Sequence, residues 1–225
     1  SEKMASLGQL VAGVAHEINT PVASIKSNNS IISKLIPQIE QEDLRVMLSQ
    51  INSIDKEAIA RISNIVVSLK KFVRLDEAEL QEANINKEID LTLDLISHET
   101  KNRIEIEKHY GDIPPIKCYP NMLNQVFTNI LVNACQAITG VGKIVISTDY
   151  KEGNLIVKIQ DNGQGIPKEN LNKIFTVGYT TKGVGVGTGL GLAISQKIID
   201  KHHGKIQVNS EVGVGTEFII TIKGE

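Results

Sequence analysis

Apolar residues in the first 80 positions recur at intervals of three and four, which is the spacing of one face of a helix. One such series covers residues 4–35, and a second covers residues 44–72. Residues 37–43, which lie between them, hold a proline and several polar side chains. The pattern therefore predicts a helical hairpin whose turn lies in residues 37–43.

The apolar stripe on each predicted helix is wide. In a seven-residue frame, the first helix has two series, interrupted only by a proline and an asparagine: Met4, Val11, Ile18, Ile25 and Ile32, and Leu7, Val14, Pro21, Asn28 and Leu35. The second helix carries further apolar residues beside its own seam, namely Met47, Ile54, Ile59, Val66 and Val73. One hairpin cannot cover so wide a stripe, so we expect two copies to pair into a dimeric four-helix bundle.

Beyond about residue 80, short runs of alternating polar and apolar residues replace the helical pattern. They predict strands at 143–150, 155–161, 205–210 and 217–223, with helices near 86–97, 120–138 and 190–203. Strands and helices mixed without regular alternation indicate an α+β two-layer sandwich, with helices on one face of a mixed sheet. We place the boundary in the polar segment between Asp76 and Asn86, which gives domains at residues 1–80 and 81–225.

The composition narrows the classes of function. The chain has 225 residues, of which 41% are hydrophobic and 22% charged, and its formal net charge is −2. This charge disfavours binding to nucleic acid or to an anionic membrane. Two cysteines are too few for a disulfide framework, so we expect buried thiols and a cytoplasmic setting.

The N-terminal sequence lacks the features of a secretion signal. No apolar run approaches the roughly 20 residues that span a bilayer. The chain begins at Ser1 without an initiator methionine, so we expect it to be a fragment that lacks an upstream region. A membrane anchor, if there is one, would lie in that region.

His16 is the histidine whose surroundings suggest chemistry. In the seven-residue frame it lies at the position farthest from the apolar seam, where a lone histidine is ordinarily a solvated surface residue. The same ordinary interpretation holds for His98, His109, His202 and His203. His16 differs because of the residues that follow it.

Glu17, Thr20 and Pro21 follow His16 on the same predicted helix. A proline inside a helix removes a backbone hydrogen bond, costs about 3 kcal/mol or more and bends the helix. That bend could give another domain access to the imidazole, which is partly neutral and nucleophilic near pH 7. Glu17 could orient the ring, and the Thr20 hydroxyl could position a water molecule. A zinc motif of the His-Glu-x-x-His type is excluded because Thr20 occupies the position of its second histidine.

Residues 16–21, His-Glu-Ile-Asn-Thr-Pro, resemble the H-box of sensor histidine kinases. In that box a histidine is followed by an acidic residue, then by Thr or Asn at the fourth position and Pro at the fifth. The resemblance implies that residues 1–80 form a dimerisation and histidine-phosphotransfer domain, with His16 as the phospho-acceptor.

Gln125, Asn129 and Asn133 recur at four-residue spacing on one predicted helix, and such a polar face could simply be solvated. Amide oxygens, however, are neutral ligands that suit Mg²⁺. The segment resembles a nucleotide-binding box of the same kinases, whose ATPase domain is shared with gyrase. The resemblance implies that Asn133 is the metal ligand and that Asn129 contacts the phosphate side.

Asp161 follows a predicted strand and precedes Gly163 and Gly165. A hairpin turn is the ordinary interpretation of this pattern. The segment also resembles the family's adenine box. There the aspartate accepts a hydrogen bond from the adenine amino group, and the glycines let the backbone approach the base.

A glycine-rich run at residues 183–192 leads into a predicted helix. It could be a flexible loop, but a helix N-terminus also attracts phosphate. The run resembles the family's ATP lid, which implies nucleotide contacts from Lys182, Gly187, Thr188, Gly189, Leu190 and Gly191. It departs from the usual lid at Gly178 and Gly183, where Phe and Pro are expected, and it is not a Walker A loop.

Gly213, Gly215 and Thr216 precede the last predicted strand and resemble the final nucleotide box, although they could form an ordinary hairpin turn. By resemblance, Thr216 helps to hold adenine.

The resemblance covers nearly the whole chain. It implies that an ATP-binding domain carrying ATP and Mg²⁺ phosphorylates His16, and that an aspartate of a response-regulator partner then accepts the phosphoryl group. Two alternatives remain: a regulator phosphatase in which Thr20 orients water, and a dimeric signalling scaffold without catalysis.

Overall fold

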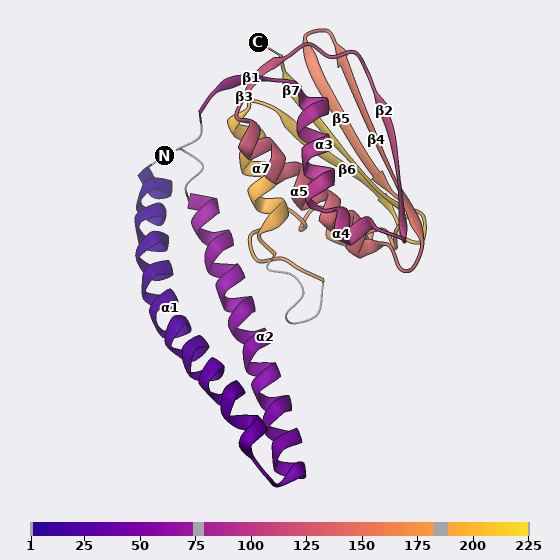
Figure 1. The fold of residues 1–225 in the computed structure, drawn as a ribbon. Coiled ribbons are helices and arrows are strands. Elements are labelled where there is room, and N and C mark those ends of the chain that lie inside the picture. Colours follow the sequence, from indigo (N-terminus) through magenta and orange to yellow (C-terminus); the bar gives the residue numbers. More distant parts are fainter. Residues whose placement is uncertain (1, 74–78, 182–188, 225) are drawn as a thin grey trace. The chain divides into compact units, whose positions relative to one another are not determined.

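The computed structural model describes the backbone of residues 2–73, 79–181 and 189–224. Within α1 and α2, the side chains of residues 2–17, 20, 61, 64–65 and 67–73 lie outside the described part. The chain divides into two compact units, a helical unit that ends near residue 76 and an α/β unit that begins near residue 77. Figure 1 shows the ribbons of both units.

The helical unit is a hairpin. It consists of α1 (Glu2–Leu35), the short 3-10 helix η1 (Ile36–Gln38) and α2 (Glu42–Val73). The turn therefore lies where the proline and polar residues predict it. Pro21 lies inside α1, which continues past it, and the axis of α1 curves along its length (Figure 1).

The interior of the hairpin uses a different register from the predicted seven-residue frame. The buried residues repeat every seven positions, as Val22 and Asn29 on α1 followed by Ile36 on η1, and as Asn52, Ile59 and Val66 on α2. The predicted seam residues Ile25 and Ile32 are instead 48% and 42% exposed. Within a single chain, the edge of the apolar stripe that faces the neighbouring helix therefore differs from the predicted seam, because periodicity shows a wide stripe but not which edge of it faces that helix.

The main sheet of the α/β unit has the strand order β2-β4-β5-β7-β6. Its strands are β2 (Ile104–Tyr110), β4 (Gly142–Lys151), β5 (Asn154–Asp161), β6 (Lys205–Glu211) and β7 (Gly215–Lys223). β2 pairs with β4 in parallel, and the other neighbours are antiparallel. The strands β1 (Gln81–Ala83) and β3 (Ile116–Cys118) form a separate antiparallel pair.

Helices cover one face of this sheet (Figure 1). They are α3 (Ile85–Leu95), α4 (Ser97–Thr100), α5 (Pro120–Ala137) and α7 (Gly191–Lys201), and the short helix α6 (Lys168–Leu171) lies in the connection between β5 and α7. On the covered face, alternate residues of β5 and β7 such as Leu155, Val157, Ile220 and Ile222 are at most 1% exposed. The α+β two-layer sandwich is therefore confirmed.

Arg103 fixes the end of α5. Its guanidinium donates hydrogen bonds to the carbonyl oxygens of Cys135 (2.6 Å) and Ile138 (3.1 Å). These carbonyls lack partners inside the helix, and a cation at this end also favours the helix dipole. This contact anchors the helix that carries Asn129 and Asn133.

The interior of the α/β unit holds both cysteines as free, buried thiols. Burial raises the pKa of Cys118 to about 11, and burial also raises the pKa of Cys135. The prediction of buried thiols is confirmed. Among the described residues, no helix is long and apolar enough to span a bilayer.

Candidate active site

Asp161 ends β5 on the face of the sheet that the helices cover. Asp161 is only 6% exposed, and its Oδ1 accepts a hydrogen bond from the Gly163 N–H at 2.8 Å. Burial raises the pKa of Asp161, while hydrogen bonds from the backbone N–H groups of Gly163 and Thr216 act in the opposite direction. Because two backbone amides donate to it, this buried carboxyl group is prepared to act as an acceptor.

The loop after Asp161 packs closely against the turn between β6 and β7. Gly165 has a positive φ of 73°, and a Cβ atom there would lie 2.1 Å from the Glu211 carbonyl oxygen. Any larger residue at position 165 would therefore collide with backbone as well as strain the chain. In addition, Gln164 accepts from the Gly213 N–H at 2.9 Å, which joins the loop to the turn.

Asn129 contacts the start of α7. Its Nδ2 donates to the Gly191 carbonyl oxygen at 2.8 Å and to Ser195 Oγ at 3.2 Å. Ser195 Oγ itself donates to the same Gly191 carbonyl at 2.9 Å. The predicted phosphate-side residue thus holds the first turn of α7, and Ser195, which the sequence analysis did not single out, takes part in the same cluster.

The structure describes only some of the predicted lid residues. Lys182, Gly187 and Thr188 lie outside the described residues. Gly189 has a φ of 65°, and a Cβ atom there would come within 2.4 Å of the Gly178 backbone, so only glycine fits. Leu190 is buried, and Gly191 is the first residue of α7. The N-terminus of this helix therefore directly follows the glycine-rich run, as the sequence predicts.

Asn133 lies about one turn beyond Asn129 on α5 and is half-buried. The described residues contain no group of three or more His, Cys, Asp or Glu side chains that could hold a metal ion. Mg²⁺ bound to a nucleotide takes most of its ligands from phosphate and water, so a single amide oxygen is a suitable protein ligand. The residues present therefore fit a magnesium ion brought in with a nucleotide.

Thr216 lies directly opposite Asp161 in the pairing of β5 with β7 and is 4% exposed. On its other side it pairs with Ser210 of β6, and the two hydroxyl oxygens are 2.9 Å apart. Residues directly opposite on paired strands project from the same face. Ser210 was missed by the sequence analysis because it is an ordinary small polar residue in an alternating strand.

His16, Glu17 and Thr20 are helical residues of α1, but their side chains lie outside the described part of the chain. The predictions made for these three side chains therefore stay predictions. Their place within a long helix of the hairpin agrees with the helix expected around His16.

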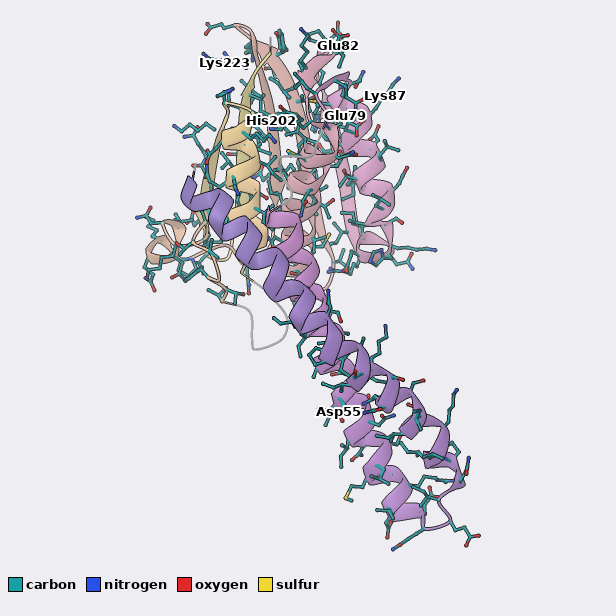
Figure 2. The ribbon with its side chains drawn as sticks, turned by 90° about the vertical axis from the view of Figure 1, so that its left-hand side faces the viewer. Asp55, Glu79, Glu82, Lys87, His202 and Lys223 are labelled. Atoms are coloured by element: carbon teal, nitrogen blue, oxygen red, sulfur yellow. The ribbon has the colours of Figure 1, made fainter. Side chains whose placement is uncertain are left out.

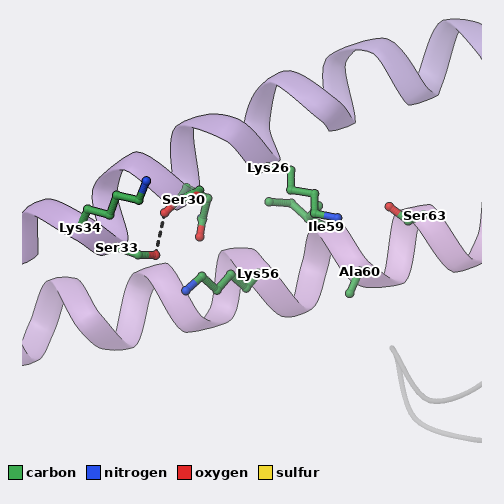
Figure 3. A pocket seen from close by; sticks show the side chains of 9 residues that line it. Lys26, Ser30, Ser33, Lys34, Lys56, Ile59, Ala60 and Ser63 are labelled. Atoms are coloured by element: carbon green, nitrogen blue, oxygen red, sulfur yellow. Dashed lines mark hydrogen bonds between the residues drawn. The ribbon is translucent and has the colours of Figure 1, made fainter.

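A groove of about 670 Å³ lies between α1 and α2 farther along the hairpin (Figure 3). Lys26 and Lys34 line it from α1, and Lys56 lines it from α2. Among the described residues that line the groove, none is acidic. Ser33, one of the lining residues, accepts a hydrogen bond at its Oγ from Asn52 Nδ2 at 2.7 Å and donates to the Asn29 carbonyl oxygen at 2.8 Å. The groove is therefore basic.

Two family descriptions match the chain over its two units. Residues 6–78 match the His Kinase A (phospho-acceptor) domain, and residues 118–225 match the Histidine kinase-, DNA gyrase B-, and HSP90-like ATPase. The solved catalytic domain of histidine kinase ThkA superposes with a TM-score of 0.60 at 32% identity, over 65% of this chain and 96% of that one. The chain belongs to the histidine kinase family.

Curated relatives of this histidine kinase include the signal transduction histidine-protein kinase AtoS of Escherichia coli strain K12. AtoS is 37% identical over 226 residues, which is 99% of this chain and 36% of AtoS. ThkA solved in complex with response regulator protein TrrA is also similar, with a TM-score of 0.70 and 26% identity over 100% of this chain and 64% of that one. The chain spans between about a third and a half of the length of the curated relatives it matches.

His202 of the kinase is not the solvated histidine that the sequence suggests. It is 8% exposed, its Nδ1 lies 2.8 Å from the Ile198 carbonyl, and its Nε2 accepts from the Tyr119 N–H at 3.0 Å (Figure 2). Burial lowers the pKa of His202. The ordinary interpretation was therefore wrong for this residue, which joins the end of α7 to the start of α5.

Proposed function

We propose that this chain binds ATP with Mg²⁺ in its α/β unit and transfers the γ-phosphoryl group to His16. A response-regulator aspartate then accepts the phosphoryl group. The observation that carries the proposal is the buried Asp161 carboxyl group, flanked by Thr216 and by the loop that holds Gly163 and Gly165. This acceptor belongs to an ATPase-family unit that is joined to a phospho-acceptor family segment containing His16.

Adenine recognition is assigned to Asp161 and Thr216. The 6-amino group of adenine needs a hydrogen-bond acceptor, and an ionised carboxylate can only accept. Hydrogen bonds to charged groups are worth about 1.5–3 kcal/mol, and more is lost when a buried partner is left unpaired. Asp161 therefore supplies base selection rather than chemistry.

Phosphate binding is assigned to the N-terminus of α7 and to the glycine-rich run before it. The helix dipole and unpaired backbone N–H groups favour negative charge at this end. Asn129 holds the first turn of α7 through Gly191, and Asn133 is the proposed ligand of Mg²⁺. When bound, Mg²⁺ offsets the charge of the phosphate oxygens.

Phosphoryl transfer is a displacement at the γ-phosphorus. A lone pair on one ring nitrogen of His16 forms the N–P bond, while the bond from phosphorus to the β,γ-bridging oxygen breaks and ADP leaves. The imidazole gains positive charge and then loses a ring proton to solvent. Glu17 is proposed to orient the ring and to balance that charge. Thr20, one turn along, is the residue proposed to position water for later removal of the phosphoryl group.

The basic groove of the hairpin is proposed as the surface that receives the regulator. Position 34 lies about five helical turns after position 16, on the same face of α1. Lys26, Lys34 and Lys56 give this surface a positive potential that would attract an acidic partner. The solved complex of ThkA with response regulator protein TrrA supports a partner of this kind.

The exposed apolar residues of the hairpin support a homodimer. Ile25, Ile32, Ile51, Ile54 and Ile62 are each more than a third exposed in the single chain. A second copy that covers them would complete a four-helix bundle.

A two-stage assay tests the proposal. The chain is incubated with γ-labelled ATP and Mg²⁺, freed of nucleotide, and mixed with a purified receiver domain. We expect label on the chain in the first stage and its loss to the receiver in the second. A chain that binds ATP but takes up no label would overturn the kinase assignment.

The groove has its own test within this assay. Lys34→Glu is expected to slow transfer to the receiver about tenfold, because it reverses charge at the docking surface. Autophosphorylation should be unchanged. Lys87→Glu, an exposed charge reversal on the α/β unit, is the matched control. Equal transfer rates for the two variants would contradict docking at the groove.

A further inference from the structure

Ser210 lies beside the proposed adenine site and makes three hydrogen bonds through one hydroxyl group. Its Oγ donates to the Gly215 carbonyl oxygen at 2.9 Å and accepts from the Ile166 N–H at 2.8 Å. Its third contact is the Thr216 hydroxyl, at 2.9 Å between the two oxygens. The contacts join β6, the start of β7 and the loop that follows Asp161.

The proton count decides the direction of the third hydrogen bond. A serine hydroxyl has one proton to donate and two lone pairs that accept. The proton of Ser210 is used by the Gly215 carbonyl, so the Thr216 hydroxyl must be the donor in the bond between the two side chains. The N–H of Ile166 and the O–H of Thr216 then fill both lone pairs of Ser210.

This arrangement leaves Thr216 with no proton for a ligand. Its single hydroxyl proton points at Ser210, and only the lone pairs of its Oγ1 remain free to interact. Thr216 stands directly opposite Asp161 across the paired strands, on the same covered face of the sheet. The carboxylate and this hydroxyl oxygen together form a pair of acceptors.

We propose that Ser210 is a positioning residue that makes Thr216 an acceptor and so helps the site to select a 6-amino purine over a 6-oxo purine. The inference deepens the proposed function and rests on ATP binding at this site. Adenine presents N–H donors at position 6, which match two acceptors. Hypoxanthine presents a carbonyl oxygen there, which would face two acceptors without a donor and would be left unpaired.

ITP is the sharpest probe because it differs from ATP in carrying the 6-oxo group and the N1 proton, and it lacks the 2-amino group of GTP. The measurement is the ratio of the dissociation constants of ITP and ATP, each titrated with Mg²⁺ into the 225-residue chain. In Ser210→Ala, the Thr216 proton loses its acceptor and can turn toward a 6-oxo group. We expect the ratio to shrink about fivefold to tenfold, the value of one hydrogen bond.

Two companion variants separate this role from a merely structural one. Ser210→Thr keeps the hydroxyl and is expected to retain the wild-type ratio. In a Thr216→Val background the hydroxyl is absent, so adding Ser210→Ala should not lower the ratio of the ITP and ATP dissociation constants any further. A purely structural role for Ser210 would weaken ATP and ITP binding equally and leave the ratio unchanged in every background.

Each outcome decides the matter. An unchanged ratio in Ser210→Ala, or an equal change with and without the Thr216 hydroxyl, overturns the inference while ATP binding by the wild type leaves the proposed function standing. Failure of the wild type to bind ATP overturns both. Should Ser210→Ala not fold, Thr216→Val and Thr216→Ser carry the test. Thr216→Val is expected to lower the ratio of the ITP and ATP dissociation constants, and Thr216→Ser is expected to keep the wild-type ratio. Equal ratios for these two variants overturn the inference.

Discussion

At the scale of the residue, Asp161 combines two opposed effects. Burial disfavours its charged form, whereas the N–H groups of Gly163 and Thr216 favour it. Burial is the larger effect and raises the pKa of Asp161, while the two backbone N–H groups offset part of the cost of burying the charge of this proposed purine acceptor.

Replacing Asp161 by asparagine tests this balance. The asparagine side chain carries an NH2 donor in place of one acceptor oxygen. This donor would face either the Gly163 N–H or the adenine amino group, which are donors themselves. We expect ATP affinity to fall between about tenfold and about a hundredfold, in line with hydrogen bonds to charged groups. The measurement is calorimetric titration with ATP and Mg²⁺. Asp149→Asn, which alters a carboxylate on the neighbouring strand β4, is the control and should bind normally; equal affinities for the two variants would contradict the role of Asp161.

The sequence identifies Asp161 but not Ser210, and the reason is physical. An aspartate followed by glycines after an apolar strand is unusual enough to indicate a site. Ser210 matters only because folding brings it between Ile166, Gly215 and Thr216. Long-range hydrogen bonds of this kind leave no periodic signal in the sequence.

At the scale of the element, α7 is linked to α5 at both of its own ends. Asn129 of α5 bonds to Gly191 and Ser195 at the start of α7, and His202 at the end of α7 accepts from the Tyr119 N–H just before α5. These links fix the helix that carries the proposed metal ligand against the helix proposed to bind phosphate.

Asn129→Ala should loosen the start of α7. It removes a donor to the Gly191 carbonyl and to Ser195 Oγ, which should cost about 1–2 kcal/mol of folding stability. Because this helix end is proposed to bind phosphate, ATP affinity should fall as well. Urea unfolding and ATP titration measure the two effects. Gln125→Ala, one turn earlier on α5, is the matched control, and a loss of similar size in that variant would argue against a specific role for Asn129.

His202 makes stability depend on pH. The pKa of His202 is lowered in the folded chain, chiefly by burial, from an ordinary value of 6.5 that applies when the chain is unfolded. As pH falls below about 6.5, the unfolded chain takes up a proton that the folded chain does not, so the free energy of unfolding decreases. Above that pH the contribution of His202 to stability is complete.

His202→Leu should remove this dependence. We expect a lower free energy of unfolding at pH 7.5, by about 1–3 kcal/mol for the orphaned Tyr119 N–H, and a flatter decline toward pH 5.5. Urea unfolding at both pH values gives the comparison. His203→Asn alters the adjacent exposed histidine, whose positive φ asparagine tolerates, and it should keep the wild-type decline. A decline in His202→Leu as steep as in the wild type would refute the linkage.

The elements also show what periodicity can and cannot give. The helices near α5 and α7 and the strands β4, β5, β6 and β7 follow from clear patterns in the sequence. β2 was missed because its sequence, IEIEKHY, places charged residues on the open face of an edge strand and resembles a polar loop. Periodicity did not indicate which edge of the apolar stripe faces the neighbouring helix of the same chain, because the exposed edge is as regular as the buried one.

At the scale of the whole molecule, the hairpin leaves a regular set of apolar residues uncovered. Ile25 and Ile32 on α1 and Ile51 and Ile54 on α2 are between 42% and 65% exposed. The basic groove uses other positions of the same helices. This separation would allow a dimer and a docked regulator to coexist.

Ile32→Glu tests the dimer. A charge at this position would have to be buried in a four-helix bundle, which is strongly unfavourable without a partner. We expect sedimentation equilibrium to show a dimer for the wild type and a monomer or a much weaker dimer for Ile32→Glu. Ser30→Glu places the same charge on the groove side and should remain dimeric. A wild-type chain that is monomeric at micromolar concentration would contradict the bundle.

The most direct measurement maps the phosphorylated residue after incubation with γ-labelled ATP and Mg²⁺. Mass spectrometry of the chain is expected to find the phosphoryl group on His16, with no label in His16→Gln and normal labelling in His98→Gln, a change at an exposed histidine. Label on another residue, or labelling of His16→Gln at the wild-type level, would contradict the central claim that the ATP-binding unit acts on His16.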